Sequence, residues 1–250
     1  MTIMGSDNQQ VIRFFATGEH DCSYIEQAEA RTLFADPSAT MNTLIYSSLS
    51  ERGFRRSGSH IYRPYCDNCQ KCIATRLPVN KFKATRSQRR NLRKNADLRV
   101  EVVRDISDEQ FYLLYEKYIN TRHQDGDMYP ATREQYDSFL TSEWGSTRYA
   151  VFYDTQSEDS KNTETEVPIA VAVFDELNDG LSAIYTFYDP DQEQRGLGTF
   201  AVLWQIFAAK QLGAEHVYLG YWIKECQKMA YKINFKPIEL LINDSWTLLN

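Results

Sequence analysis

The stretch from residue 181 to residue 212, LSAIYTFYDPDQEQRGLGTFAVLWQIFAAKQL, decides the fold class of this chain. Its first eight residues are rich in β-branched, aromatic and small apolar side chains, which predicts a strand. A turn that contains Gly196 and Gly198 follows, and the apolar segment after it predicts a buried helix that ends near Leu212. The stretch is therefore a strand, a glycine turn and a helix in direct succession.

Regular elements continue on both sides of this unit. Two strands are predicted before it, and after it come a strand, a helix and a last strand, at residues 149–153, 169–174, 216–220, 225–231 and 238–242. The polar segment 154–166 predicts a hairpin loop. We expect a mixed α/β fold, in which a C-terminal lobe with a mixed sheet accompanies a smaller N-terminal lobe.

The order of these elements resembles that of the Gcn5-related N-acetyltransferase fold. In that fold the glycine turn presents backbone N–H groups to a phosphate at the start of the helix. The position three residues before the first glycine usually carries Gln or Arg there, and in this chain it is Glu193. The turn is therefore either a phosphate-binding loop or a tight connection packed by small residues.

Capping signals predict three further helices. One should be capped by Asp36, begin at Pro37 and end at Gly53. The other two should follow the capping boxes Ser107-x-x-Gln110 and Thr132-x-x-Gln135. The chain then divides into an N-terminal lobe, a basic segment and an acetyltransferase-like lobe, over residues 1–78, 79–105 and 106–250.

Composition sets the class of protein. The chain has 250 residues, of which 42% are apolar, enough to bury a sizeable core. No apolar run is long enough to cross a bilayer, and the N-terminus lacks the basic and apolar regions of a signal peptide. Five cysteines, an odd number, fit a reducing compartment. We expect a cytoplasmic protein with no membrane partner.

A strongly basic segment follows the N-terminal lobe, although the net charge of the chain is −6. If the segment is helical, Arg86, Arg89, Arg90 and Arg93 fall on one face, and Lys94 lies next to them. Such a face is either an ordinary solvated surface or a phosphate site, but arginines on one stripe repel one another unless an anion neutralises them. We interpret it as a surface that contacts an RNA backbone.

Three cysteines recur at a fixed spacing in Cys66-x-x-Cys69-x-x-Cys72, and Cys22 lies upstream as a fourth thiol. Thiolates at such spacing bind Zn²⁺ or an iron–sulfur cluster. Structural zinc sites normally use two separate pairs of ligands, and single buried thiols are commonly inert core residues. A metal site and a set of unreactive thiols therefore both remain open.

Several arginines lie among aromatic residues in a region that should become part of the interior. They include Arg55 and Arg56, with Tyr62 close by and Arg76 further along the chain. A buried guanidinium needs an anionic partner. That partner is either an acidic residue of the same chain or the carboxylate of a ligand.

Dispersed motifs in these regions resemble those of the arginyl-tRNA–protein transferase family, from about residue 20 to residue 240. The motifs are Asp36-Pro37, Arg52-Gly-Phe-Arg-Arg-Ser-Gly58, Tyr62-Arg-Pro-Tyr-Cys-Asp-Asn-Cys-Gln-Lys-Cys72, Arg122-His-Gln-Asp-Gly-Asp-Met128, Tyr185-Thr-Phe-Tyr-Asp-Pro-Asp191 and Tyr218-Leu-Gly-Tyr-Trp-Ile-Lys-Glu-Cys-Gln-Lys-Met229. The resemblance is to the bacterial members that use leucyl-tRNA. It implies transfer of leucine to proteins that begin with Asp or Glu, which marks them for degradation.

The resemblance also implies roles for the unusual residues. The basic face of residues 86–94 would hold the tRNA acceptor arm, and Arg55, Arg56, Tyr62 and Arg76 would meet the acidic N-terminal residue of the acceptor protein. Eukaryotic relatives hold a metal or cluster on N-terminal cysteines, although the arrangement here differs. Three alternatives stay open: an arginyl-tRNA donor, an acyl-CoA-dependent N-acetyltransferase, and a non-catalytic RNA-binding module.

The reaction would be aminolysis of an already activated ester. Such a reaction needs an amine placed against the carbonyl and a stabilised oxyanion, and it needs neither a covalent intermediate nor a cofactor. Because an α-amino group has a pKa of about 8, a modest base suffices. The candidate catalytic residues lie on the strand and turn at Asp175, Tyr185, Tyr188 and Asp189, although strand tyrosines are often core and Asp-Pro often forms a turn.

Overall fold

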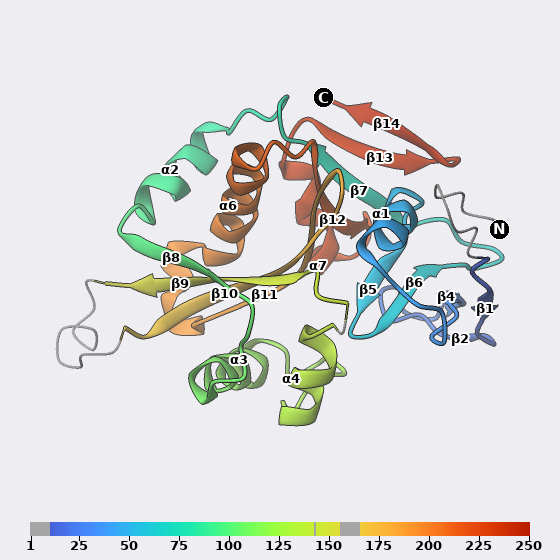
Figure 1. Cartoon of the computed structure of the whole chain (residues 1–250), viewed down its shortest axis with the longest axis horizontal. Helices are drawn as coiled ribbons and strands as arrows, with labels where there is room; N and C mark the ends of the chain where they lie inside the picture. Colours follow the sequence, from blue (N-terminus) through green and yellow to red (C-terminus); the bar gives the residue numbers. More distant parts are fainter. Residues whose placement is uncertain (1–10, 143, 156–165) are drawn as a thin grey trace.

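The computed structural model describes residues 11–142, 144–155 and 166–250. An eight-stranded sheet forms its centre, and a four-stranded sheet lies to one side of it (Figure 1). The predicted hairpin loop at 154–166 lies largely outside the described residues. The mixed α/β class predicted from the sequence is confirmed.

The large sheet contains one parallel pair of strands, β11 with β12, and its other pairs are antiparallel. From one edge to the other its strands are β14 (Ser245–Leu249), β13 (Ile238–Ile242), β7 (Ile73–Pro78), β12 (His216–Trp222), β11 (Gly180–Tyr188), β10 (Pro168–Glu176), β9 (Thr147–Asp154) and β8 (Leu98–Val103). The predicted meander and the strand after the helix are both present.

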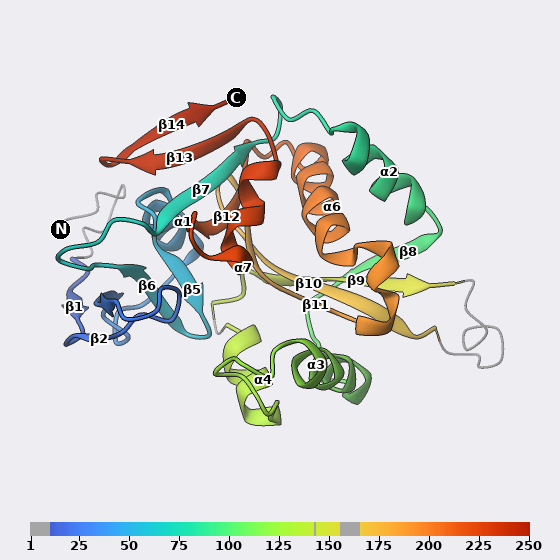
Figure 2. The same cartoon turned by 180° about the vertical axis from the view of Figure 1, so that it is seen from behind.

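Helices cover both faces of the large sheet (Figures 1 and 2). On one face lies α6 (Leu197–Gln211), with α2 (Arg86–Lys94) beside it; on the other lie α3 (Glu109–Arg122) and α4 (Arg133–Leu140). α6 is apolar on nearly every side because it packs between the sheet and α2. The structure has the predicted order of a strand (β11), a glycine turn, a helix (α6) and a strand (β12). The acetyltransferase-like prediction rested on this order.

The N-terminal lobe holds the smaller sheet, a two-stranded ribbon and one helix. Its elements are β1 (Phe14–Ala16), β4 (Thr32–Ala35), β6 (His60–Pro64) and β5 (Arg55–Ser57) in sheet order, the ribbon of β2 (His20–Asp21) and β3 (Glu29–Ala30), and α1 (Thr43–Glu51). Tyr46 and Leu49 of α1 are buried together with Leu177 and Tyr218 of the other lobe. The two lobes therefore share one core.

The predicted lobe boundaries at residues 78 and 105 need correction. β7, which the prediction placed in the N-terminal lobe, lies inside the large sheet and pairs with both β12 and β13. β8, which follows the basic helix, forms an edge of the same sheet. The reason is that strand pairing joins segments distant in sequence, which a pass along the chain does not detect.

β11 and β12 pair only at their beginnings, from Gly180 opposite His216 to Ser182 opposite Tyr218. Beyond these residues the two strands separate, and we call this point the fork. At the start of the ladder a Cβ on Gly180 would lie 2.3 Å from the His216 carbonyl oxygen, so only glycine allows this approach. A bulge on β11 at Ile184, just past the fork, breaks the regular alternation of side chains.

The helix caps agree with the predictions in part. Thr132 caps α4 as predicted, and Gly53, with φ of +82°, follows the end of α1. α1, however, begins at Thr43 behind the cap Asn42, because the Asp36 carboxylate instead accepts the backbone N–H of Ser38 in a local turn. α3 is capped by Asp108, one residue after the predicted Ser107.

Three short helices complete the chain, η1 (Pro190–Arg195), α7 (Gln227–Ala230) and η2 (Tyr231–Asn234). The last two stand where a single helix was predicted at residues 225–231. In the part of the chain that the structure describes, no helix has the length and apolarity that crossing a bilayer requires.

Candidate functional site

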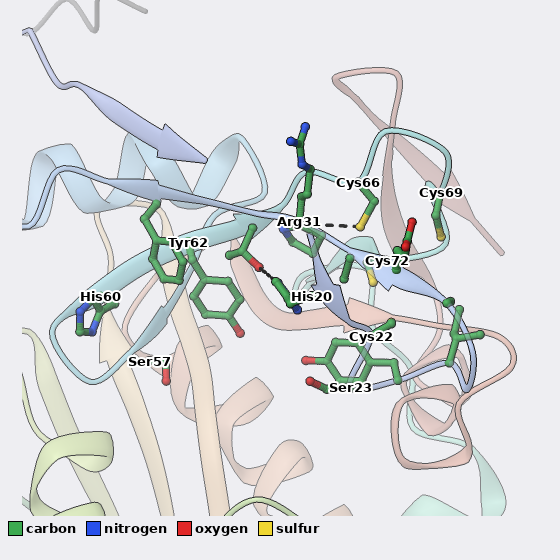
Figure 3. A pocket seen from close by; sticks show the side chains of 18 residues that line it. His20, Cys22, Ser23, Arg31, Ser57, His60, Tyr62, Cys66, Cys69 and Cys72 are labelled. Atoms are coloured by element: carbon green, nitrogen blue, oxygen red, sulfur yellow. Dashed lines mark hydrogen bonds between the residues drawn. The ribbon is translucent and has the colours of Figure 1, made fainter. Parts of the chain in front are cut away.

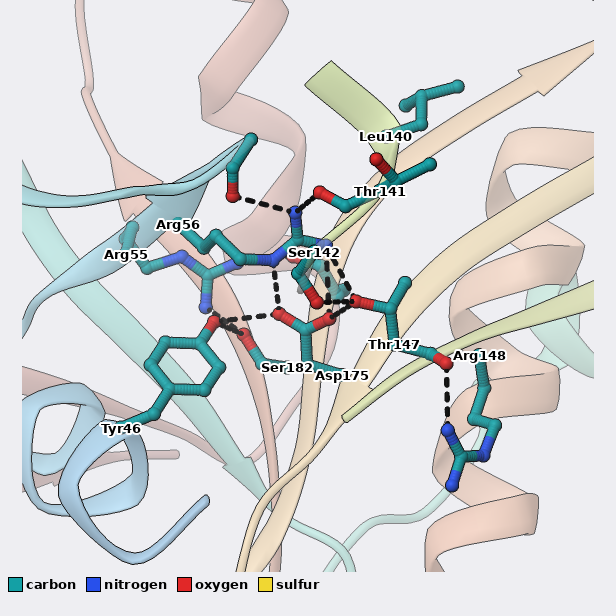
Figure 4. Close-up of polar contacts among 12 residues, drawn as sticks. Tyr46, Arg55, Arg56, Leu140, Thr141, Ser142, Thr147, Arg148, Asp175 and Ser182 are labelled. Carbon is teal, nitrogen blue, oxygen red and sulfur yellow. Dashed lines mark hydrogen bonds and ion pairs between the residues drawn. The ribbon is translucent and has the colours of Figure 1, made fainter. Parts of the chain in front are cut away.

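A buried ion pair lies beneath the fork (Figure 4). Arg56 donates from Nε to Asp175 Oδ2 (2.7 Å) and from Nη2 to Asp175 Oδ1 (3.0 Å), and neither side chain is exposed to solvent. Tyr46 and Thr147 donate their hydroxyl groups to the same carboxylate at 2.9 and 2.7 Å. The Asp175 carboxylate thus accepts four hydrogen bonds from groups inside the protein, so the network is a structural element.

This geometry corrects two of the predicted roles. Asp175 was a candidate proton acceptor, but its carboxylate is saturated by Arg56 and two hydroxyl groups and has no access to solvent. Arg56 was a candidate for binding the acceptor's acidic residue, but Asp175 already neutralises it. The internal-acid alternative holds for this arginine.

Arg55 points from β5 into the fork itself. Its Nη1 donates to Ser182 Oγ (2.9 Å), and its Nη2 donates to the Ala183 carbonyl, at the place where β11 leaves β12. Gly220, on β12, has φ of +83°, and a Cβ there would lie 3.4 Å from Arg55 Nε. The guanidinium therefore fills the space between the two strands, and within the described residues no carboxylate pairs with it.

A second buried cation lies close to Arg55. Lys232 is 5% exposed, and its Nζ donates to the Tyr221 carbonyl (2.6 Å) and lies 2.9 Å from Met229 Sδ. Burial, and secondly the Arg55 charge, lower the pKa of Lys232 to about 7. The sequence did not reveal this residue, because an isolated lysine in a polar segment carries no pattern.

We expect Lys232→Met to be more stable than the natural protein at pH 7, by about 1–3 kcal/mol, since an unpaired buried cation is costly. Between the folded-state pKa of about 7 and the unfolded-state pKa of 10.5, the Lys232 amine is neutral in the folded protein but protonated in the unfolded chain. The advantage should therefore be complete below pH 7 and shrink as the pH rises toward about 10. Urea unfolding at pH 7 and pH 9.5 measures it; a variant less stable at pH 7 would show that Lys232 serves mainly to hold the fold.

Arg76 and Tyr62 occupy different surroundings. Arg76 donates from Nε to Glu239 Oε2 (2.6 Å), and its guanidinium lies 4.4 Å from the centre of the Trp246 ring. The predicted role of Arg76 in binding an acidic ligand is therefore corrected, because Glu239 already supplies its anion. Tyr62 pairs with Arg55 across β5 and β6, and its ring packs against Tyr221 at 6.3 Å. Tyr62 therefore lies beside the fork.

Two tyrosines past the fork belong to an aromatic cluster with α3. The ring of Tyr118 lies 4.8 Å from that of Tyr188, 6.4 Å from that of Tyr185 and 5.0 Å from that of His123. Within the described residues the Tyr185 hydroxyl and the His123 Nε2 atom are both buried without a hydrogen-bond partner. Buried polar atoms are normally paired, so each of these two atoms keeps an unused hydrogen-bonding capacity.

Asp189 has a structural role. Its carboxylate accepts the Asp191 backbone N–H (3.1 Å) as the cap of η1, and Lys117 Nζ lies 2.6 Å from it. The carboxylate therefore holds the start of η1 and forms an ion pair with Lys117, while the proton-accepting role given to Asp189 from the sequence stays a prediction.

The arginine face is present on α2 as predicted. Thr85 and Gln88 form the capping box, and Arg86, Arg89, Arg90 and Arg93 are exposed. Within the described residues no acidic side chain forms an ion pair with these four. The face is therefore a stripe of uncompensated positive charge.

α2 also contacts the glycine turn before α6. Asn91 Nδ2 donates to the carbonyls of Arg195 (3.0 Å) and Gly196 (3.1 Å), and the Lys94 ammonium donates to the Gln194 carbonyl. Glu193, the unusual residue of this turn, pairs with Arg122 at 3.0 Å. The basic helix thus lies directly beside the N-terminal end of α6.

The four predicted cysteine ligands line one cavity of about 410 Å³ in the N-terminal lobe (Figure 3). Burial, with the other thiols nearby, raises the pKa of Cys72 to about 12. Four soft sulfur donors suit zinc or an iron–sulfur cluster. Within the described residues, however, no three ligand atoms are arranged closely enough to hold an ion. The four thiols line the same cavity, and the metal site predicted from the sequence stays a prediction.

Two family models match the chain. The model for the N terminus of the arginine-tRNA-protein transferases matches residues 20–90, and the model for their C terminus matches residues 110–242. The chain belongs to this family. The resemblance stated from the sequence is confirmed, and the protein is an aminoacyl-tRNA–protein transferase whose substrates are an aminoacyl-tRNA and an acceptor protein.

Curated relatives align over nearly the whole chain. A protein of Teredinibacter turnerae is 51% identical over 235 residues, which cover 94% of this chain and 93% of the relative. One of Pseudomonas fluorescens is 48% identical and covers 96% and 97%, and one of Pseudomonas aeruginosa is 49% identical and covers 95% and 97%. Each is named aspartate/glutamate leucyltransferase.

Solved structures with a related shape include L-PGS from Bacillus licheniformis and FemX. The first has 11% identity and a TM-score of 0.44, and covers 62% of this chain and 46% of that chain. The second has 12% identity and a TM-score of 0.43, and covers 84% and 79%.

Proposed function

We propose that this protein transfers leucine from leucyl-tRNA to the α-amino group of proteins that begin with Asp or Glu, and that it does so in the cytoplasm. The observation that carries the proposal is the continuity between the α2 arginine face, the N-terminal end of α6 and the fork. The names of the relatives support leucine as the donor and Asp or Glu as the acceptor.

The acceptor arm of the tRNA would follow this path. Its phosphates would bind the arginines of α2, which contacts the glycine turn through Asn91. Beyond that turn, a Cβ on Gly198 would lie 3.5 Å from Tyr188, so the start of α6 abuts the aromatic cluster. A phosphate near the 3′ end would meet the N-terminal end of α6, and the terminal base would stack on a tyrosine.

The chemistry at the fork requires positioning and a hydrogen-bond donor. The neutral α-amino group of the acceptor attacks the ester carbonyl, and the oxyanion that forms needs a donor in a site that excludes water. The unpartnered Tyr185 hydroxyl is suited to that role, and Tyr188 would orient the ester. The 3′ oxygen of the tRNA leaves with the proton that the amine loses, so no cofactor is required.

The charges near the fork favour leucine over arginine as the donor. Arg55 and Lys232 are both buried there, and the carboxylate of Asp175 is neutralised by Arg56. A cationic side chain on the donor would meet these like charges near the fork, where the Asp175 carboxylate is already paired with Arg56. An acyl-CoA donor is disfavoured because Glu193 sits in the turn that would hold its pyrophosphate.

The proposal is tested by mixing the purified protein with radiolabelled leucyl-tRNA or arginyl-tRNA and with peptides that begin with Asp, Glu, Lys or Ala. Label should pass from leucyl-tRNA to the Asp and Glu peptides alone. Transfer of arginine instead would show that arginyl-tRNA is the donor. If neither tRNA gave transfer and acetyl-CoA acetylated the peptides, the protein would be an N-acetyltransferase.

Tyr185→Phe should lower kcat about 10–100-fold with little change in the dissociation constant for tRNA, because it removes a donor that acts on the oxyanion. Tyr112→Phe is the matched control, since that hydroxyl donates to Glu116 on the surface of α3. Single-turnover transfer measures both. A Tyr185→Phe protein with the natural rate would assign the hydroxyl no part in the chemistry.

We also propose that Cys22, Cys66, Cys69 and Cys72 hold a zinc ion or an iron–sulfur cluster, with a small rearrangement of the loop that carries the last three. Thiolates bound to a metal would stabilise the N-terminal lobe without a part in the transfer. Elemental analysis of protein purified without oxygen should find zinc or iron, and Cys69→Ser should lower that content and the melting temperature. Metal-free protein of unchanged melting temperature would support the inert-thiol alternative.

A further inference from the structure

The inner side of α2 is polar. The helix carries one apolar residue, Leu92, which packs against the core between α6 and the large sheet. Three amide side chains, at positions 88, 91 and 95, share the inner side by helical spacing, and Gln88 and Asn95 are 5% and 1% exposed. Surface helices normally attach through an apolar stripe. α2 is instead attached largely by hydrogen bonds, which are directional and fix its orientation.

Three consecutive carbonyl groups of the glycine turn accept hydrogen bonds from α2. These carbonyls belong to Gln194, Arg195 and Gly196, and the donors are Lys94, Asn91 and Asn95. Asn91 Nδ2 binds two of the carbonyls, and Asn95 Nδ2 lies 3.0 Å from the Arg195 oxygen. At the other end of the amide series, Gln88 Nε2 donates to the Asn234 carbonyl at 3.1 Å. The inner side of α2 thus determines where the carbonyls of the turn point.

Asn91 also determines how α6 begins. Gly196 has φ of +63°, and a Cβ there would lie 2.8 Å from Asn91 Nδ2, so the amide stands where another residue would place its side chain. Gly196 is the N-cap of α6, and its carbonyl accepts the N–H of Phe200 at 3.1 Å. Because the peptide group is planar, the amide that fixes this carbonyl also fixes the N–H of Leu197, the first residue of α6.

The arginine face lies on the outer side of the same helix. Arg90 and Asn91 are adjacent in the sequence, yet Arg90 is exposed while Asn91 reaches the turn. α2 has nine residues, about two and a half turns, so it is short enough to move as one body. A displacement of the arginines therefore displaces the amides as well.

From this arrangement we propose that Asn91 and Asn95 are positioning residues, which couple the binding of the tRNA acceptor arm to the placement of its ester. The inference rests on the proposed function and adds to it the route by which binding on α2 reaches the reacting group. Phosphates held by the arginines fix α2, and the two amides carry that position to the glycine turn and to the start of α6. The binding energy of the acceptor arm then raises the rate of transfer, and not the affinity alone.

The test compares two donors that share the ester and differ in the arm, leucyl-tRNA and 3′-O-leucyl-adenosine. Single-turnover transfer to a peptide that begins with Asp, extrapolated to saturating donor, gives one rate for each. Leucyl-tRNA should react about 30-fold faster or more in the natural protein, and Asn91→Leu, which keeps the size of the side chain but removes its N–H groups, should reduce this ratio about 10-fold. The dissociation constant for leucyl-tRNA should change less than about threefold, because the arginines remain. Asn178→Leu, at an exposed position between β10 and β11, should leave the ratio unchanged.

The ratio separates coupling from damage, because a turn that is merely distorted would slow both donors equally. Asn91→Leu should remain folded, since the Arg195 guanidinium still anchors the turn to Asp97 and Asp154, each at 2.9 Å. If that variant were unstable, Asn91→Ala, which leaves space instead of filling it, would be measured in the same way.

A folded variant with the natural ratio would overturn the proposal, as would a natural protein that uses both donors at the same rate. If the protein transfers arginine and not leucine, the donor in the proposed function fails. The same ratio, measured with arginyl-tRNA and arginyl-adenosine, would then decide whether α2 couples binding to transfer.

Discussion

Asp175→Ala is expected to lower the free energy of unfolding by about 3–5 kcal/mol, because it leaves the Arg56 guanidinium buried without an anion. Tyr46 and Thr147 would lose their acceptor in the same step. Since these groups come from α1, β5, β9 and β10, the loss should loosen the junction between the lobes. Urea unfolding monitored by tryptophan fluorescence measures the change.

Asp137→Ala is the control for this variant. Asp137 also pairs with an arginine, Arg133 at 3.5 Å, but its side chain is 55% exposed, so its loss should cost less than about 1 kcal/mol. A second variant, Asp175→Leu combined with Arg56→Met, removes both charges and should recover much of the stability. If Asp175→Ala were as stable as the natural protein and inactive in transfer, Asp175 would regain its predicted role as a proton acceptor.

Replacing Arg86, Arg89, Arg90 and Arg93 together with Gln should weaken the binding of leucyl-tRNA by about 100-fold or more at moderate salt. Each guanidinium that binds a phosphate releases counterions, so the slope of log affinity against log salt should fall by about 3. The fold should be unaffected, because all four side chains are exposed and α2 keeps its capping box. Filter binding between 50 and 200 mM salt measures both quantities.

The control for this experiment is Lys210→Gln with Lys236→Gln, which removes exposed cations from positions away from α2. It should change the affinity only slightly and leave the salt slope within one unit of the natural value. Should the fourfold variant keep its slope, the arginine face would be a solvated surface and the tRNA would have to bind elsewhere.

The sequence predicted the fold best where a single element carries its own signal. The strands of the meander and the apolar helix α6 are strongly patterned, so their existence and order were predicted from residues alone. The cap at Asp36 was misread because the same side chain can cap a helix or close a turn, and here Ser38 closes the turn.

The candidate site was predicted less well, because charge pairing is decided by contacts over long sequence separations. Arg55 and Arg56 are neighbours in the chain, yet only Arg56 meets an acid, Asp175, which lies 119 residues away. Glu239, which neutralises Arg76, is 163 residues from it. The sequence shows that these arginines are present but does not identify the acids that pair with them. Lys232 stands out only because the structure buries its side chain.

The position of β7 has a consequence for how such a chain can change. β7 belongs to the first third of the sequence, but it lies between β12 and β13 of the last quarter and pairs with both. A fragment that began after the basic helix would expose the facing edges of β12 and β13, which favours aggregation. The two segments that the family models match therefore share one sheet, and an exchange of either segment between relatives would have to preserve the pairing of β7 with β12 and β13.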